Sequence, residues 1–159
     1  MILKGIIDTD TVNYKKISMV LEFPKCNFKC DHECGRQVCQ NSALATAPII
    51  ATTFASVYHR YADNNLTSAI ITQGLEPFDS WNDLWGFINY VRNFEKCDDD
   101  IVIYTGYTKC EIADKVEILR EFPNIIIKFG RYVPDQQSHY DEVLGVELAS
   151  DNQYAEKIS

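Results

Sequence analysis

Ile17-Ser18-Met19-Val20-Leu21-Glu22-Phe23 is a partly alternating apolar run that ends at Pro24. An apolar run of this length, closed by proline, predicts a β-strand. Four of the six cysteines follow directly, and they are Cys26, Cys30, Cys34 and Cys39. The predicted strand therefore leads straight into a cysteine-rich loop.

Strands and helices are expected to alternate along the rest of the chain. Short apolar runs at 68–72, 101–105 and 124–128 predict further strands, and helical patterns cover 48–62, 80–94 and 109–120. This alternation is typical of βαβ units and a mainly parallel sheet. Because the units are too few for a closed eight-stranded barrel, we expect an α/β fold with an open, partial barrel. No repeat or linker divides the chain, so residues 1–159 are expected to form a single domain.

Composition and charge exclude several classes of protein. With 46% hydrophobic residues the chain is too apolar to be disordered. No stretch approaches the ~20 apolar residues that span a bilayer, and no secretory signal is evident, so we expect a cytoplasmic protein. Fifteen basic against 23 acidic residues give a net charge of −8, which argues against nucleic acid or an anionic membrane as partner.

Thiolates clustered in one loop are typical of zinc sites and of iron–sulfur clusters. A zinc knuckle would need a second pair of ligands, and Cys97 and Cys110 lie far apart in the sequence. These two are expected to be ordinary thiols. His32, inside the loop, is expected to face solvent rather than bind a metal.

The loop resembles the radical S-adenosylmethionine (SAM) proteins, whose motif is C-x3-C-x2-C with a hydrophobic residue before the third cysteine. Cys26 and Cys30 match the first two positions. Cys39 follows Val38 and precedes Asn41 by two residues, which matches the end of the motif in glycyl-radical activases after an insertion. The resemblance favours Cys26, Cys30 and Cys39 as metal ligands, with Cys34 as the alternative third ligand.

The resemblance also implies two cofactors. Three cysteines would hold a [4Fe–4S] cluster and leave one iron open for SAM. Gly74-Leu75-Glu76-Pro77 resembles the GGEP segment of the family, with Leu75 in place of the second glycine. Gly74 and Glu76 would then lie beside the methionyl group of SAM, and Val38 and Asn41 would also contribute to the cofactor site. Taken alone, Glu76 could instead be a solvated turn residue.

Thr105-Gly106-Tyr107 resembles a W-T-G-Y segment in activating proteins of anaerobic ribonucleotide reductase, and this places Thr105 near SAM. Lys128 to Tyr132 and Ala149 to Gln153 resemble later segments of the same family. The implied partners are a large glycyl-radical enzyme, such as an anaerobic ribonucleotide reductase, and an electron donor such as a flavodoxin. No residue is assigned a catalytic role.

Two other functions remain open at this point. The chain could be a radical SAM enzyme that acts on another peptide or on a small molecule. It could also be a non-catalytic zinc- or cluster-binding module that uses all four clustered cysteines. The segments around Glu76 and Thr105 count against the second alternative, because such a module needs neither of them.

Overall fold

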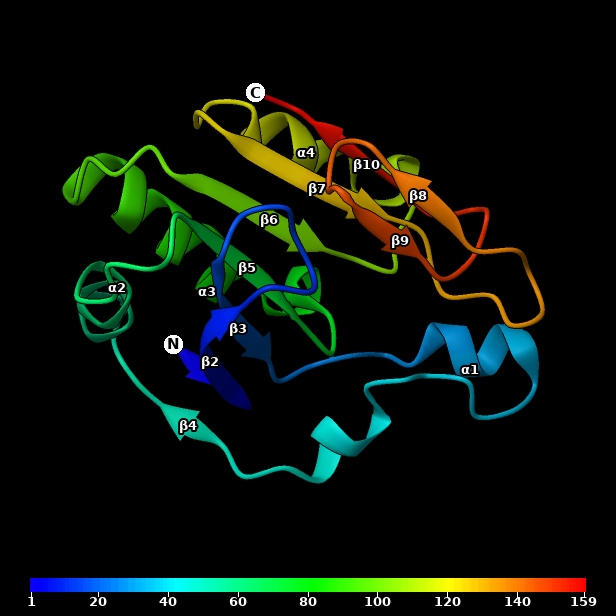
Figure 1. The fold of residues 1–159 in the computed structure, drawn as a ribbon. Helices are drawn as coiled ribbons and strands as arrows, with labels where there is room; N and C mark the ends of the chain where they lie inside the picture. Colours follow the sequence, from blue (N-terminus) through cyan, green and yellow to red (C-terminus); the bar gives the residue numbers. More distant parts are fainter.

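A six-stranded sheet in the order β10-β7-β6-β5-β3-β2 forms the centre of the computed structural model, which describes residues 1–159 (Figure 1). The four inner strands run parallel, and the two edge strands, β2 and β10, are antiparallel to their neighbours. The mainly parallel, open sheet confirms the predicted α/β class and is consistent with a partial barrel. The strands are β2 (Gly5–Asp10), β3 (Ser18–Phe23), β5 (Ala69–Gly74), β6 (Asp100–Tyr104), β7 (Ile125–Phe129) and β10 (Tyr154–Lys157).

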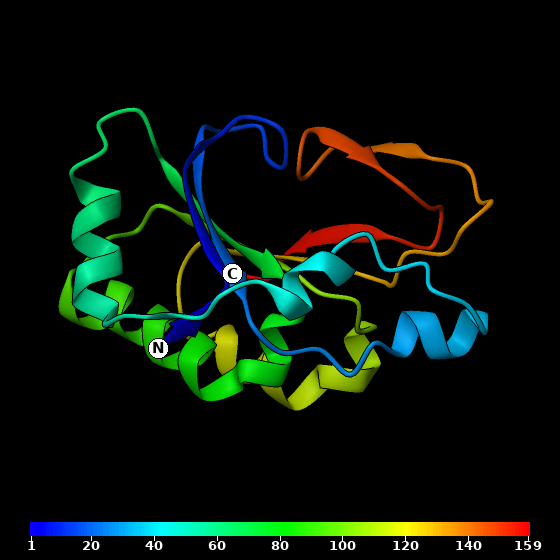
Figure 2. The ribbon, with the colours of Figure 1, turned by 90° about the horizontal axis from the view of Figure 1, so that it is seen from below.

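Helices cover one face of this sheet (Figure 2). They are α2 (Phe54–Ala62), α3 (Trp81–Asn89) with a π-helical continuation over Tyr90–Phe94, and α4 (Ala113–Leu119). Short 3-10 turns at Pro77–Ser80 and Lys109–Ile112 lead into α3 and α4. Alternate residues of each strand point to the helices, as Met19, Leu21 and Phe23 do in β3, and they form the larger hydrophobic core.

The opposite face carries a smaller core. The hairpin of β8 (His139–Asp141) and β9 (Val146–Leu148) lies over this face (Figure 2). Val20, Ile71 and Val102 pack there against Leu144 and Leu148 from the hairpin segment. Both faces of the parallel strands are therefore covered, which explains why the sequences of these strands are nearly continuous apolar runs.

The predicted helix over 48–62 is wrong in its first part. β4 (Ile50–Ala51) pairs with the short strand β1 (Ile2–Leu3), and α2 begins only at Phe54. Thr53 caps the helix, because its hydroxyl accepts a hydrogen bond from the Ser56 N–H at 3.0 Å. Pairing with β1 holds the preceding residues extended.

The cysteine loop leaves the carboxyl end of β3 and returns along the lower edge of the molecule in the view of Figure 1. It contains α1 (Lys29–Cys34) and a 3-10 turn over Ser42–Thr46. None of the helices combines the length and the hydrophobicity needed to cross a membrane.

Candidate functional site

A cavity of about 360 Å³ lies at the carboxyl ends of the parallel strands, between the cysteine loop and the β8–β9 hairpin. Ligand sites in open α/β sheets collect at this end of the strands. Most of the residues predicted for the site line this cavity; they are Cys26, Cys30, Cys39, Asn41, Gly74, Glu76 and Thr105. Val38 and Cys34 do not line it.

Three thiols share the cavity wall. Burial, and next the charge of Cys39, raise the pKa of the Cys30 thiol to about 12. Burial likewise raises the pKa of Cys26 to about 11, with a smaller contribution from Cys39. All three cysteines line the cavity, whereas Cys34 does not.

The donor set fits an iron–sulfur cluster. In a [4Fe–4S] cluster each thiolate binds a different iron, so the ligands are distributed around the cluster. Three neighbouring thiols around a cavity match this requirement. The Phe28 N–H also donates a hydrogen bond to Cys26 Sγ at 3.2 Å, which favours the thiolate.

Glu76 is buried at the floor of the site, with 4% of its surface exposed. Its carboxylate accepts hydrogen bonds from the Phe78 N–H at 3.1 Å, the Thr105 hydroxyl at 2.8 Å and the Gly106 N–H at 2.9 Å. The alternative of a solvated turn residue is therefore wrong. Burial outweighs these three donors and raises the pKa of Glu76 to about 7.

Lys128 is a buried cation on the same cavity, and the sequence analysis gave it no role. Its ammonium donates to the carbonyl of Gly130 at 2.7 Å, and burial lowers its pKa to about 8. The charge of Glu76 opposes this shift, so the two side chains lie close enough to interact. In the sequence, Lys128 follows an apolar run and begins the segment to Tyr132 that resembles the family, but neither feature indicates that its side chain is buried.

Asn41 and Gly74 join the two loops that border the cavity. The Asn41 side-chain amide donates to the Gly74 carbonyl at 2.7 Å. Gly74 has a φ of 97°, and a Cβ at this position would lie 2.8 Å from the backbone nitrogen of Phe23. Only glycine fits this close approach of two strand ends.

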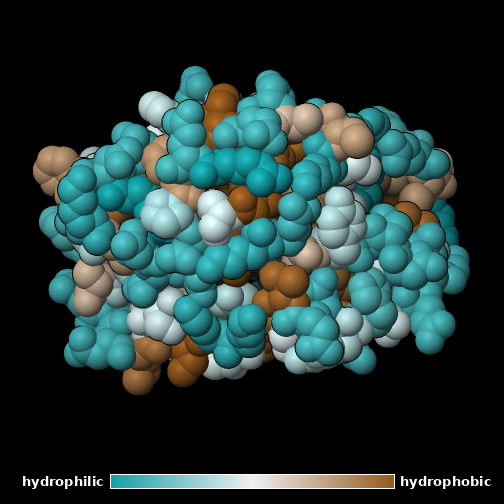
Figure 3. Space-filling view, turned by 90° about the horizontal axis from the view of Figure 1, so that it is seen from above, coloured by the Kyte–Doolittle hydropathy of each residue, from teal (hydrophilic) through white to brown (hydrophobic).

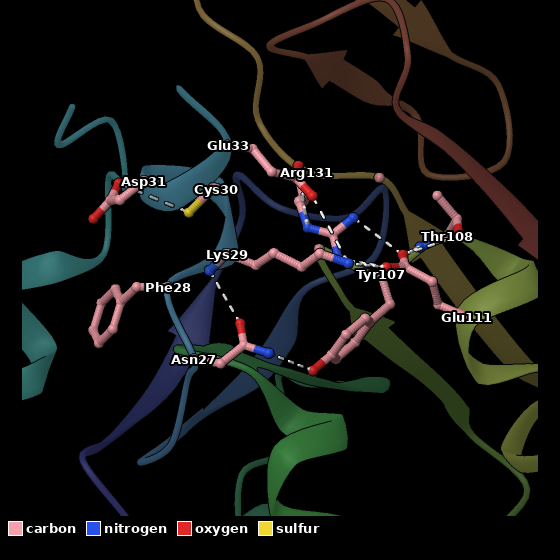
Figure 4. Close-up of polar contacts among 12 residues, drawn as sticks. Asn27, Phe28, Lys29, Cys30, Asp31, Glu33, Tyr107, Thr108, Glu111 and Arg131 are labelled. Carbon is pink, nitrogen blue, oxygen red and sulfur yellow. Dashed lines mark hydrogen bonds and ion pairs between the residues drawn. The ribbon is translucent and has the colours of Figure 1, made fainter. Parts of the chain in front are cut away.

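A charged network ties α1 to the ends of the neighbouring strands (Figure 4). The ammonium of Lys29 and the guanidinium of Arg131 both reach the carboxylate of Glu111, at 2.6 Å and 2.8 Å. Glu33 adds weaker ion pairs to Lys29 and Arg131, each at 3.8 Å. Hydrogen bonds to Arg131, foremost, and to Lys29 hold the pKa of Glu111 well below its usual range.

His32 lies exposed on α1, as expected. Cys97 and Cys110 lie outside the cavity, and both are free thiols, as are the other four cysteines. Cys97 is half-buried and Cys110 is exposed.

Comparison with known protein families decides the class of the site. A family model described as "4Fe-4S single cluster domain" matches residues 16–154, which include β3 to β9 and every residue that lines the cavity except Val12 and Asn13. The chain belongs to this family. The family is typical of radical SAM glycyl-radical activases, so the protein is a radical SAM-type enzyme whose cofactors are a [4Fe–4S] cluster and SAM. No curated protein and no solved structure matches the chain.

Proposed function

We propose that this protein generates a glycyl radical on a large partner enzyme, most simply an anaerobic ribonucleotide reductase. The observation that carries the proposal is the meeting of Cys26, Cys30 and Cys39 with Glu76 and Thr105 around one cavity. In this family, activases act on glycyl-radical enzymes. One domain over residues 1–159 would perform the reaction.

Cys26, Cys30 and Cys39 would hold the cluster and leave one iron free of protein ligands. When bound, the cluster supplies an electron that splits SAM into methionine and a 5′-deoxyadenosyl radical, which removes hydrogen from the substrate. The protein contributes binding, orientation and exclusion of water. Cys34 lies off the cavity and would not be a ligand in the native protein.

The two buried charges suit the methionyl group of SAM. Glu76 has an ionisable carboxylate with three hydrogen bonds, which leaves room to accept one more from an ammonium. Lys128 donates one hydrogen bond within the protein, so its ammonium has further donors for a carboxylate. Thr105 would act by orienting Glu76, because its hydroxyl donates to that carboxylate at 2.8 Å.

The substrate would be a segment of a protein rather than a small molecule. Val12 lines the cavity while 72% of its surface is exposed, so the cavity opens to solvent beside the loop after β2. A partner could cover this opening and exclude water. An electron donor such as a flavodoxin would be needed to reduce the cluster.

Electron paramagnetic resonance (EPR) tests the proposal. The protein is reconstituted anaerobically with iron and sulfide, reduced with dithionite, and mixed with SAM and an anaerobic ribonucleotide reductase from the same genome. We expect a glycyl-radical signal on the reductase with the wild type and with Cys97→Ser, and none with Cys26→Ser. Cleavage of SAM without a radical on the reductase would instead favour a radical SAM enzyme with another substrate.

Stoichiometric zinc without SAM binding would favour the non-catalytic module and would contradict the proposal.

A further inference from the structure

The spacing between the second and third cluster ligands is the unusual feature of this loop. Residues 31–38 separate Cys30 from Cys39, whereas the motif that the loop resembles has two residues there. Such an insertion could place Cys39 anywhere around the loop. Cys39 nevertheless lines the cavity together with Cys30.

Asp31 binds the backbone at the other end of the insertion. Its Oδ1 accepts hydrogen bonds from the backbone N–H groups of Val38 and Cys39, both at 2.8 Å. One carboxylate oxygen, in the residue next to the second ligand, thus holds the backbone of the third ligand.

The path of the chain from Asp31 to Cys39 fits a loop that returns to its starting point. α1 ends at Cys34, and Gly35 follows with a φ of 63°, the left-handed conformation that commonly terminates a helix. The chain then turns back toward Asp31. Beyond Cys39, the Asn41 side chain is fixed to the Gly74 carbonyl. Cys39 is therefore held on both sides, by Asp31 and by Asn41.

Cys34 has no comparable support. It lies at the end of α1 and does not line the cavity. Its neighbour Glu33 points instead to Lys29 and Arg131 (Figure 4). The contacts of the two acidic residues on α1 therefore differ, since only Asp31 binds the returning chain.

We propose that Asp31 is the positioning residue that folds residues 31–38 back onto α1 and thereby makes Cys39, rather than Cys34, the third ligand of the cluster. This inference rests on the proposed function and extends it to the choice of ligand. Asp31 acts through the backbone N–H groups of Val38 and Cys39, and the same oxygen also accepts a long hydrogen bond of 3.9 Å from the Cys30 thiol (Figure 4). It explains how a motif with a long insertion keeps three thiols around one cavity.

The test compares iron retention after anaerobic reconstitution and challenge with a chelator. Loss of partners behind a ligand commonly weakens metal binding about 10–100-fold, and we expect Asp31→Ala to release iron faster by that order. Asp31→Asn keeps an oxygen that can accept both N–H groups and should stay close to the wild type. Glu33→Gln is the matched control, because it changes the same charge on the same helix without touching Val38 or Cys39.

Cys34 supplies a second comparison. Cys34→Ser should retain iron like the wild type, whereas Asp31→Ala combined with Cys34→Ser should lose it at least as fast as Asp31→Ala alone. Iron retention in Asp31→Ala equal to the wild type would overturn the inference, as would equal losses in Asp31→Ala and Glu33→Gln. A cluster that depends on Cys34 and survives Cys39→Ser would overturn it too.

Amide hydrogen exchange in the iron-free protein separates this inference from the proposed function. The Val38 and Cys39 amides should exchange faster in Asp31→Ala than in the wild type or Asp31→Asn. Unchanged amide exchange in Asp31→Ala would overturn the inference. The proposed function would still stand if the wild type bound its cluster. A wild type that binds no cluster would overturn both, even if the exchange rates showed the Asp31 contacts.

Discussion

Two buried charges of opposite sign, Glu76 and Lys128, lie on the cavity at the ends of β5 and β7. Burying an ionised group without full compensation costs free energy, and the raised pKa of Glu76 and the lowered pKa of Lys128 express this cost. Buried groups with such shifts are common at functional sites. At the scale of single residues, these two side chains therefore indicate a functional site at this cavity, as the cysteines do.

The first prediction concerns the pH dependence of stability in the iron-free protein. The pKa of Glu76 rises from 4.5 to about 7 on folding, so the folded state binds the extra proton and stability falls as pH rises through this window. At 1.36 kcal/mol per pKa unit the loss is about 3 kcal/mol. Of the charges facing Glu76, Asp79 adds to the shift, and Lys128 stays protonated below its pKa of about 8.

Urea unfolding at pH 5, 6, 7 and 8 measures this dependence. Glu76→Gln should remove most of it, because glutamine does not titrate. Glu142→Gln, at an exposed position, is the control and should keep the slope of the wild type. A wild-type stability that rises between pH 5 and 7 by an amount that Glu76→Gln abolishes would contradict the assigned shift.

At the scale of elements, the site depends on where strands end and how closely their ends approach. Gly74 ends β5 with a φ of 97°, and an added Cβ would meet backbone atoms of Glu22 and Phe23 within 3.0 Å. Backbone cannot move aside as a flexible side chain can. The contact between β3 and β5 therefore requires glycine at this position.

Gly74→Ala should lower the free energy of unfolding by roughly 2–4 kcal/mol, from the strained φ and the clash together. Gly35→Ala is the matched control, since Gly35 also has a positive φ, 63°, but a Cβ there would meet nothing within 4 Å. We expect it to cost only about 1 kcal/mol. Urea unfolding of the iron-free proteins measures the loss of unfolding free energy in each variant. Equal losses in Gly74→Ala and Gly35→Ala would argue against a close backbone approach at Gly74.

The ion pairs of Glu111 predict a local effect on α1. Glu111→Gln weakens the bonds to Lys29 and Arg131, so amides of α1 should exchange with solvent faster. The global free energy of unfolding should change by less than about 1 kcal/mol, because such pairs lie near the surface. Glu117→Gln, which affects only an exposed pair with Arg120, should leave α1 unchanged. Unaltered amide exchange of α1 in Glu111→Gln would show that the ion pairs of Glu111 do not hold α1 in place.

The inner elements could be predicted from the sequence, and the outer ones could not. The four parallel strands are buried on both faces, so continuous apolar runs such as Ala69 to Thr72 reveal them. β2 and β10 are partly polar edge strands with sequences GIIDTD and YAEK, and pairing with β3 and β7 makes them strands. Local pattern carries little information about such pairing.

The same distinction applies to the site. Cys26, Cys30, Cys39, Glu76 and Thr105 belong to short motifs at strand ends, and the fold brings them to one cavity as the alternation of elements predicts. The parts that the sequence analysis missed are contacts between distant segments or across the insertion. The burial of Lys128 beside Glu76 and the bonds of Asp31 to residues 38–39 are contacts of this kind.

At the scale of the whole molecule, one face can be described by the distribution of its polar and apolar residues. Seen from above in the orientation of Figure 1, it is mostly hydrophilic, and hydrophobic residues appear as separate patches (Figure 3). The most exposed apolar side chains, Val12, Leu66 and Phe94, come from different segments of the chain. With a net charge of −8, recognition of a protein partner should depend on the cavity rim and on polar contacts.

The central claim is that three cysteines and the cavity beside them support reductive cleavage of SAM. The most direct measurement is the 5′-deoxyadenosine formed from SAM by anaerobically reconstituted, dithionite-reduced protein with about 4 Fe per chain. We predict product with the wild type and with Cys110→Ser, which alters an exposed thiol outside the cavity, and none with Cys30→Ser. No product from fully loaded wild type, or undiminished product from Cys30→Ser, would contradict this account.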